Sequence, residues 1–243
     1  MVLNRPAKLN AITPEMMLQL SSLLNQLADG NMIRVIVIGG EGRAFCGGFD
    51  LSAFRTAGSP NNILTLVRRL QDLNDRIESL PKPVIASIQG YALGGGLEIA
   101  LACDFRFASA SSSVGQTEVN LGFIPGAGGT QRLTRLVGPA LAKKMIFTGE
   151  RIAASDALAI GLVDGVFEDS RLAAGVASFA SLLAEKPPLA LAAAKRAIGE
   201  ATHPIRAGQD LEAARFALLF SSEDVREGLS AFFEKRRARF TGT

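Results

Sequence analysis

Short apolar runs that alternate with helical patterns constrain the fold of this chain more than any other feature. Val35 to Gly40, Val84 to Ile88 and Phe105 to Ala108 have the length and residue types of buried strands. Residues 13–28 and 62–79 carry apolar side chains at helical spacing, and the second run stops at a proline pair. Strands that alternate with helices predict an α/β fold for the first two thirds of the chain.

The last third of the chain has a different pattern. Helices are predicted at 129–137, 139–147 and 155–159, a short strand at 163–167, and almost only helices beyond 169. A capping pattern at Ser222 predicts a further helix that runs toward Phe240. We expect a core at residues 1–186 and a helical region at 187–243, with a boundary before the double proline at 187–188. The helical region has more apolar surface than it can bury alone, so we expect it to pack on another subunit.

Composition excludes several classes of protein. Hydrophobic residues make up 48% of the 243 residues and charged residues 20%, as in ordinary globular proteins. One histidine and two unrelated cysteines predict a reducing compartment and no catalytic metal. The absence of a signal or membrane segment predicts a cytoplasmic protein without a membrane partner. The net charge of +3 is spread thinly apart from residues 235–239, so no nucleic-acid partner is expected.

Common catalytic fingerprints are absent. The sequence contains no G-x-G-x-x-G after a strand, no G-x-x-x-x-G-K-[ST] and no G-x-S-x-G. Its only histidine, His203, precedes a proline, and the S-x-x-K match that begins at Ser79 runs into prolines. Dinucleotide-binding, P-loop and serine-nucleophile enzymes are therefore not supported.

Two glycine-rich turns follow predicted strands and suit anion binding. They are Ala44 to Asp50 and Gly90 to Gly96, whose backbone N–H groups can face a negative charge. The second turn opens a helix, so its free amides lie at the positive end of the helix dipole. Glu98 is three residues beyond Gly95, and the dipole there favours an ionised carboxylate that acts as a base. An ordinary acid at a helix start is the alternative interpretation.

Glu118 is the second acid of interest. It precedes an apolar stretch at 119–124, which would raise the pKa of its carboxyl and keep it protonated near neutrality. Two carboxyls in opposed environments beside an anion-binding turn are what water addition to a conjugated thioester requires. A surface loop acid is the plainer interpretation, and the sequence alone does not bring the two acids together.

At these residues the chain resembles the crotonase (enoyl-CoA hydratase/isomerase) family over almost its full length. The matching stretches are 3–11, 44–51, 81–86, 90–104, 122–132, 148–149, 161–163 and 227–236. The resemblance implies a crotonase-type spiral of ββα units with a C-terminal helical trimerisation region, assembled as a homotrimer or a dimer of trimers. It implies reversible addition of water to a 2-trans-enoyl-CoA that gives a 3-hydroxyacyl-CoA, with no cofactor, because coenzyme A is part of the substrate.

The resemblance also assigns roles to single residues. Phe49 and Gly95 would supply the two amides of an oxyanion hole, Glu98 would help activate water, and Glu118 would protonate C2 of the acyl chain. The substrate's coenzyme A portion would contact Arg5, Lys8, Ala44, Asp50, Leu51, Gly94, Phe232 and Lys235.

The sequence departs from the family pattern in three places. Thr117 replaces the proline common before the second glutamate, and Phe49 is bulkier than the usual small residue. Met1 falls within the family's first strand, so a shortened sheet edge or a misplaced start is expected. A 3,2-enoyl-CoA isomerase or another acyl-CoA-transforming member is the enzymatic alternative. An acyl-CoA-binding protein without catalysis is the alternative from another class.

Overall fold

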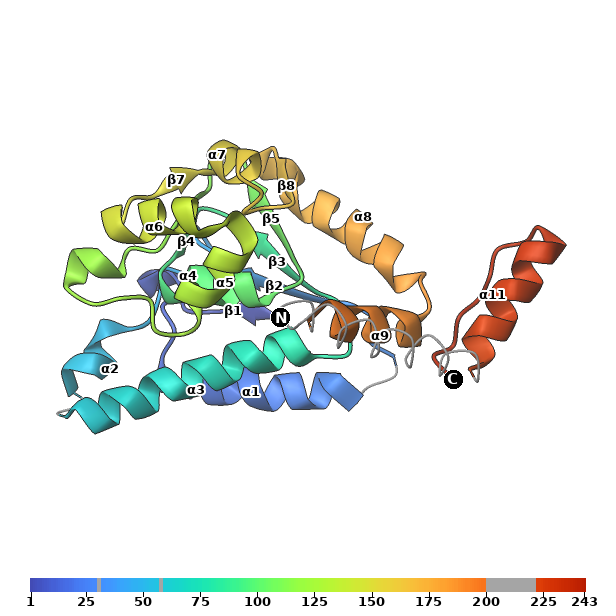
Figure 1. Ribbon diagram of the computed structural model, residues 1–243, viewed down its shortest axis with the longest axis horizontal. Helices are drawn as coiled ribbons and strands as arrows, with labels where there is room; N and C mark the ends of the chain where they lie inside the picture. Colours follow the sequence, from blue (N-terminus) through green and yellow to red (C-terminus); the bar gives the residue numbers. More distant parts are fainter. Residues whose placement is uncertain (30–31, 57–58, 200–221) are drawn as a thin grey trace.

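The computed structural model describes residues 1–29, 32–56, 59–199 and 222–243 of the chain (Figure 1). A few side chains within those ranges, including that of Phe232, are outside the description. No helix of the described part is both long enough and apolar enough to cross a membrane.

A parallel sheet of five strands forms the centre of the fold, in the order β1-β2-β3-β5-β8. Its strands are β1 (Val2–Leu3), β2 (Ile36–Gly40), β3 (Val84–Ile88), β5 (Phe105–Ser109) and β8 (Gly165–Phe167). The three apolar runs predicted as strands are β2, β3 and β5, and each shifts by at most one residue at its ends. The first three residues of β3 are fully buried, as expected for a strand covered on both faces.

A second sheet of three strands was not predicted. It consists of β4 (Tyr91–Leu93), β6 (Ser113–Gly115) and β7 (Ile152–Ala153), in the order β4-β6-β7. The sequence interpretation placed a turn at 90–96, because strands of two or three residues are too short to show a period of two. The chain thus alternates between the sheets, from β3 to β4 and from β5 to β6, before entering a helix.

The helices of the first two thirds surround these sheets (Figure 1). They are α1 (Pro14–Asp29), α2 (Leu51–Thr56), α3 (Pro60–Ser79), α4 (Gly95–Ala102), α5 (Gly129–Val137), α6 (Pro139–Thr148) and α7 (Ala154–Ala159), with short 3-10 turns η1 (Pro6–Lys8), η2 (Glu118–Leu121) and η3 (Asp169–Arg171). Ser59 caps α3 by accepting a hydrogen bond from the Asn62 amide, and the helix ends before Pro81. Helix α4 is buried along its whole length, as its apolar composition predicts. The short helix α2 was not predicted.

The C-terminal helices are α8 (Leu172–Ala184), α9 (Pro188–Gly199) and α11 (Glu223–Glu234). Helix α8 packs on β3, β5 and β8. The predicted boundary at residue 186 falls between α8 and α9, and Lys195 of α9 pairs with Asp104 beside the sheet at 2.7 Å. The expected helix toward Phe240 is too long, because Lys235 adopts a left-handed backbone that ends α11. The tail then folds back, and the Thr241 amide donates to Asp224.

Candidate functional site

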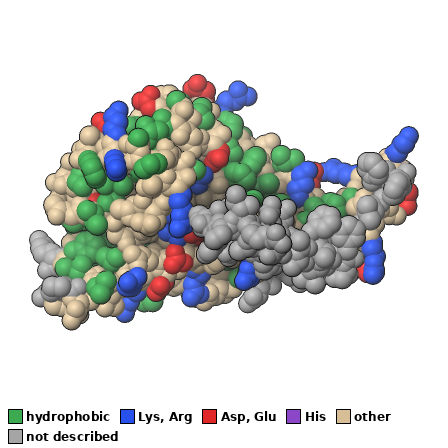
Figure 2. Space-filling view, in the orientation of Figure 1, with side chains coloured by type: hydrophobic (Ala, Val, Ile, Leu, Met, Phe, Trp, Pro, Cys, Tyr) green, Lys and Arg blue, Asp and Glu red, His purple; other side chains and the backbone are tan. Residues whose placement is uncertain are grey.

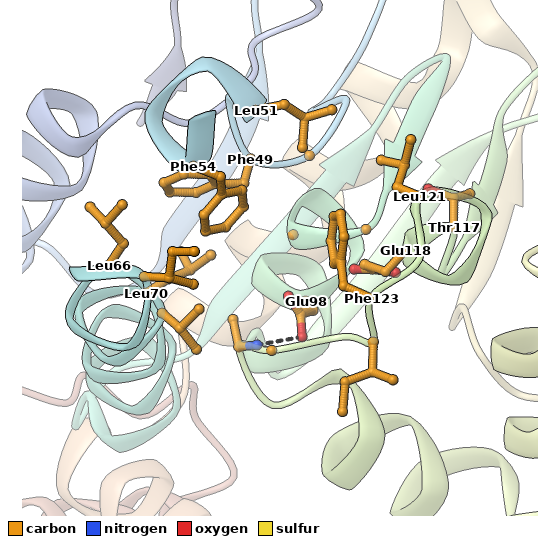
Figure 3. Close-up of a pocket in the computed structure, with 18 of the residues that line it drawn as sticks. Phe49, Leu51, Phe54, Leu66, Leu70, Glu98, Thr117, Glu118, Leu121 and Phe123 are labelled. Carbon is orange, nitrogen blue, oxygen red and sulfur yellow. Dashed lines mark hydrogen bonds between the residues drawn. The ribbon is translucent and has the colours of Figure 1, made fainter. Parts of the chain in front are cut away.

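A cavity of about 420 Å³ lies between α2 and α3 on one side and the segment after β6 on the other (Figure 3). Its apolar wall consists of Phe49, Leu51, Phe54, Ile63, Leu66, Val67, Leu70, Leu121, Phe123 and Ile124. Among the described residues that line it, only Glu98 and Glu118 carry ionisable side chains. An apolar pocket with a few convergent polar groups is the usual form of a small-molecule site.

The mouth of the cavity is also apolar. Leu51 is 46% exposed, Leu121 57% and Ile124 67%. Figure 2 shows hydrophobic side chains gathered at the end of the molecule where α2 lies. Three aromatic rings extend this surface inward: Phe49 and Phe54 lie 4.6 Å apart, and Phe54 meets Phe123 edge-on at 6.1 Å. The bulk of Phe49, unusual at this position, is therefore part of the pocket wall.

Glu98 is held in place by backbone amides. It lies in the first turn of α4, and its side chain is almost fully buried. Its Oε1 accepts hydrogen bonds from the amides of Ala127 at 2.7 Å and Gly129 at 2.8 Å. The dashed line in Figure 3 marks the first of these bonds. A Cβ at Gly129 would stand 2.9 Å from the same oxygen, so a glycine is required there.

The electrostatic setting of Glu98 differs from the sequence interpretation. The dipole of its own helix was expected to favour the ionised form, but burial raises the pKa of Glu98 and outweighs the groups that lower it. Those groups are the amides of Gly129 and Ala127 and the charge of Arg132. The amides that hold the carboxylate belong to Ala127, which precedes α5, and to Gly129, its first residue, rather than to α4.

Glu118 opens the 3-10 turn η2 and is 7% exposed. Burial, followed by the charge of Glu98, raises its pKa to about 7, which confirms the predicted direction. When the buried Gln116 amide is oriented with its nitrogen toward Glu118, that nitrogen lies 3.1 Å from both carboxylate oxygens. A Cβ at Gly94 would lie 3.0 Å from Glu118 Oε1, so this glycine makes room for the acid.

Two backbone N–H groups adjoin the carboxyls. A Cβ on Gly95 would lie 3.3 Å from the Phe49 nitrogen, so the two backbones are in close approach. Residues 48 and 50 form the ladder bonds with Ile12, which turns the Phe49 N–H to the opposite side. Among the hydrogen bonds of the described residues, neither the Phe49 nor the Gly95 amide has a partner. Both can therefore donate to an oxygen that develops negative charge.

The residues predicted to contact coenzyme A divide into two groups. Leu51 and Gly94 line the wall of the cavity, whereas Ala44 is buried and is not one of the lining residues. Arg5 and Asp50 form an ion pair at 2.6 Å. Hydrogen bonds from Ser52, followed by that from Arg5, lower the pKa of Asp50 to about 2. Lys8 is exposed on η1 and lies close to Arg5 in the chain.

Phe232 and Lys235 belong to the other end of the molecule. They lie in and just after α11, which Figure 1 places at the opposite end of the longest axis from α2. Lys235 is exposed, and the Phe232 side chain is outside the described residues. Within a single chain the structure does not bring either residue to the cavity.

Sequence reasoning missed part of the site. The Ala127 and Gly129 amides, and the aromatic row formed with Phe54 and Phe123, were not assigned a function. A helix that begins at a glycine without a side-chain cap, as α5 does, was the available signal for free amides.

The fold and the site together define a class: an α/β protein whose apolar pocket presents two buried carboxyls beside two unbonded amides. The chain belongs to the enoyl-CoA hydratase/isomerase family, whose model matches residues 1–243. The crotonase-type fold and the family resemblance read from the sequence are thereby confirmed.

Individual relatives agree with this assignment. A probable enoyl-CoA hydratase of Bacillus subtilis is 42% identical, over 98% of this chain and 93% of that protein. A crotonyl-CoA hydratase of Syntrophomonas wolfei is 38% identical, over 98% and 92%. The crystal structure of an enoyl-CoA hydratase from Bacillus anthracis superimposes with a TM-score of 0.95 at 38% identity, covering 100% of this chain and 94% of that one.

Proposed function

We propose that this protein is an enoyl-CoA hydratase that adds water reversibly to a 2-trans-enoyl-CoA and gives a 3-hydroxyacyl-CoA. The observation that carries the proposal is the pair of buried carboxyls that share one cavity with two unbonded amides. The relatives named above as hydratases support it. The reaction uses acid/base groups of the chain alone, so the substrate's coenzyme A is the only cofactor-like component.

The geometry suggests how the work is divided. The thioester oxygen accepts hydrogen bonds from the Phe49 and Gly95 amides, which stabilise the enolate that forms when C3 is attacked. Two close buried carboxyls share one proton at neutral pH, and the pair titrates as a unit. We assign the charge to Glu98, which accepts two amide bonds, and the proton to Glu118.

Each atom is then accounted for. Glu98 takes a proton from water, the hydroxyl bonds to C3, and the Glu118 proton moves to C2. A return of the proton from Glu98 to Glu118 restores the starting state. The acyl chain lies along the apolar wall between α3 and the aromatic rings, where a charged chain end would have no cationic partner among the described lining residues.

The direct test is the loss of the conjugated-thioester absorbance of crotonyl-CoA on adding purified protein. We expect Glu98→Gln and Glu118→Gln each to lower kcat by about 100-fold or more, because each removes one acid/base step. Residual isomerisation of a 3-enoyl-CoA that depends only on Glu118 would indicate the isomerase instead. Tight acyl-CoA binding without turnover in the unmodified protein would indicate a binding protein.

We further propose that the chain assembles as a homotrimer or a dimer of trimers through its helical C-terminal region. Exposed apolar side chains on α8 and α9 support this, with Ile198 72% and Leu182 49% exposed. Light scattering of the purified protein tests it, and a monomeric mass at micromolar concentration would contradict the assembly.

A further inference from the structure

Helix α3 presents one continuous face whose character changes along its length. Its first half carries Ile63, Leu66, Val67 and Leu70, which line the cavity. Residues spaced by three and four lie on one helix face, so Gln71, Asn74 and Glu78 continue the same stripe. The wall of the acyl pocket and this polar stretch are therefore parts of one rigid element.

The polar stretch binds the backbone segment that holds Glu98. Gln71 Nε2 donates to the Gly126 carbonyl at 2.6 Å. Asn74, which is fully buried, donates through Nδ2 to the Ala127 carbonyl at 2.9 Å. The segment 126–129 is thus fixed to α3 on one side and to the Glu98 carboxylate on the other.

Arg132 of α5 completes this attachment. Its Nη2 lies 2.6 Å from Asp75 and 2.6 Å from Glu78, and its Nε donates to Glu78 at 2.9 Å. Its Nη1 donates to the Ala127 carbonyl at 3.3 Å. The Arg132 side chain is only 10% exposed, and a Cβ at Gly128 would collide with its Nη1.

Three consecutive peptides of the segment are held by hydrogen bonds, the middle one through its carbonyl and the two outer ones through their amides. The Ala127 carbonyl belongs to the peptide between residues 127 and 128, and it accepts from both Asn74 and Arg132. The neighbouring peptides supply the two amides that hold Glu98. Because the central peptide shares its two Cα atoms with these neighbours, fixing it in place limits how far either amide can move.

We propose that Arg132 is a positioning residue for the reaction: with Asp75 and Glu78 of α3 it holds segment 126–129 so that the Glu98 carboxylate stays aimed at the reacting water. This inference rests on the proposed hydratase function. Misplacement of a catalytic group by about 1 Å can cost on the order of 100-fold in rate, so contacts that fix the position of Glu98 should affect kcat. It acts on the acid through the backbone and does not touch the substrate.

The test compares Arg132→Met with Arg135→Met, an exposed arginine one turn further along the same helix. For crotonyl-CoA we expect Arg132→Met to lower kcat by about 10- to 100-fold with little change in KM. Arg132→Lys should recover part of this loss, because an ammonium keeps the charge but lacks the planar fork. Arg135→Met should behave as the unmodified protein.

The pH profile of kcat separates positioning from a merely structural role. The charge of Arg132 lowers the pKa of Glu98, so its removal should move the acid limb of the profile to higher pH. Arg132→Lys should keep the limb near its original place. Glu78→Gln, at a half-exposed acid, is the milder variant, and we expect it to lower kcat by about 3- to 10-fold.

The outcomes are distinct. An Arg132→Met protein that melts earlier but keeps the kcat and acid limb of the unmodified protein would overturn the inference. If Arg132→Met does not fold, an unchanged kcat and profile in Glu78→Gln would overturn it equally. Absence of crotonyl-CoA turnover in the unmodified protein would instead defeat the proposed hydratase function.

Discussion

The start of α4 and the turn η2 each bring one carboxyl to the same cavity, but they hold it differently. Glu98 accepts two backbone hydrogen bonds on one oxygen, and the supporting segment is itself tied to α3. Glu118 faces the side-chain amide of Gln116 and lies against the backbone of Gly94, where a Cβ would stand 3.0 Å from its Oε1. A carboxylate held by two backbone amides suits the orientation of water, and a carboxyl whose pKa is about 7 suits the delivery of a proton.

The surroundings of Glu98, whose carboxylate is held by two backbone amides, should be more sensitive to an added side-chain carbon than those of Glu118. A Cβ at Gly129 would stand 2.8 Å from the end of the Gln116 side-chain amide and 2.9 Å from both Glu98 Oε1 and Pro125 Cβ. We expect Gly129→Ala to lower kcat by about 100-fold, since the carboxylate must leave its amides. Gly199→Ala is the matched control, because no atom of the described residues lies within 4 Å of a Cβ there. Equal kcat values for the two variants, measured with crotonyl-CoA, would show that Glu98 is not fixed in this way.

Glu118, the proposed proton donor, should set the upper pH limit of activity. Glu118 must be protonated to act as an acid in hydration, and its pKa is about 7. Because kcat/KM reports the free enzyme, we expect it to fall by about tenfold per pH unit above that value. A profile for crotonyl-CoA hydration that stays flat to pH 9 would contradict the assignment of the proton to Glu118.

The Gln116 amide should affect the pKa of Glu118. Donation from its amide favours the charged carboxylate, so Gln116→Met should raise the pKa of Glu118 and move the upper limb to higher pH. We expect a loss of about tenfold in kcat as the carboxyl loses this contact. Gln131→Met, at an exposed amide on α5, is the control. An upper limb that does not move would mean that the Gln116 amide faces elsewhere.

The sequence predicted one side of the site better than the other. Glu98 and Glu118 could be chosen because an acid beside a glycine-rich helix start and an acid in an apolar stretch are local patterns. The predicted direction of the Glu98 pKa shift was wrong, because that direction depends on burial by segments far away in the sequence. The partners of its carboxylate, at 127 and 129, are likewise about thirty residues away.

The fold shows the same division between local and distant determinants. The strands β2, β3 and β5 could be predicted from continuous apolar runs. The second sheet could not, since β4, β6 and β7 have two or three residues each and are stabilised by their neighbours. The switch from apolar to polar along α3 is visible in the sequence, but its meaning depends on the segment 126–132 that packs there.

The smallest effect we expect concerns stability, where burial of Glu118 should cost the folded protein free energy at high pH. Folding raises the pKa of Glu118 from 4.5 to about 7, so the folded protein binds this proton more tightly than the unfolded chain. The resulting contribution to the free energy of unfolding is fully present below pH 4.5 and is lost as the pH rises through 7. The linkage bound is on the order of 3 kcal/mol, and about 1 kcal/mol should remain as a gain in Glu118→Gln, because a buried amide is also costly.

Thermal melting at pH 8 and pH 4.5 checks this expectation, with Glu41→Gln at an exposed acid as the control. Glu118→Gln should melt higher than the unmodified protein at pH 8 and alike at pH 4.5, where both carry a neutral group at 118. A gain of the same size at both pH values would trace the effect to packing rather than to charge. A higher melting temperature of Glu118→Gln at pH 8 alone would mean that the protein retains an acid that destabilises its fold. This is expected of a group whose role is proton transfer.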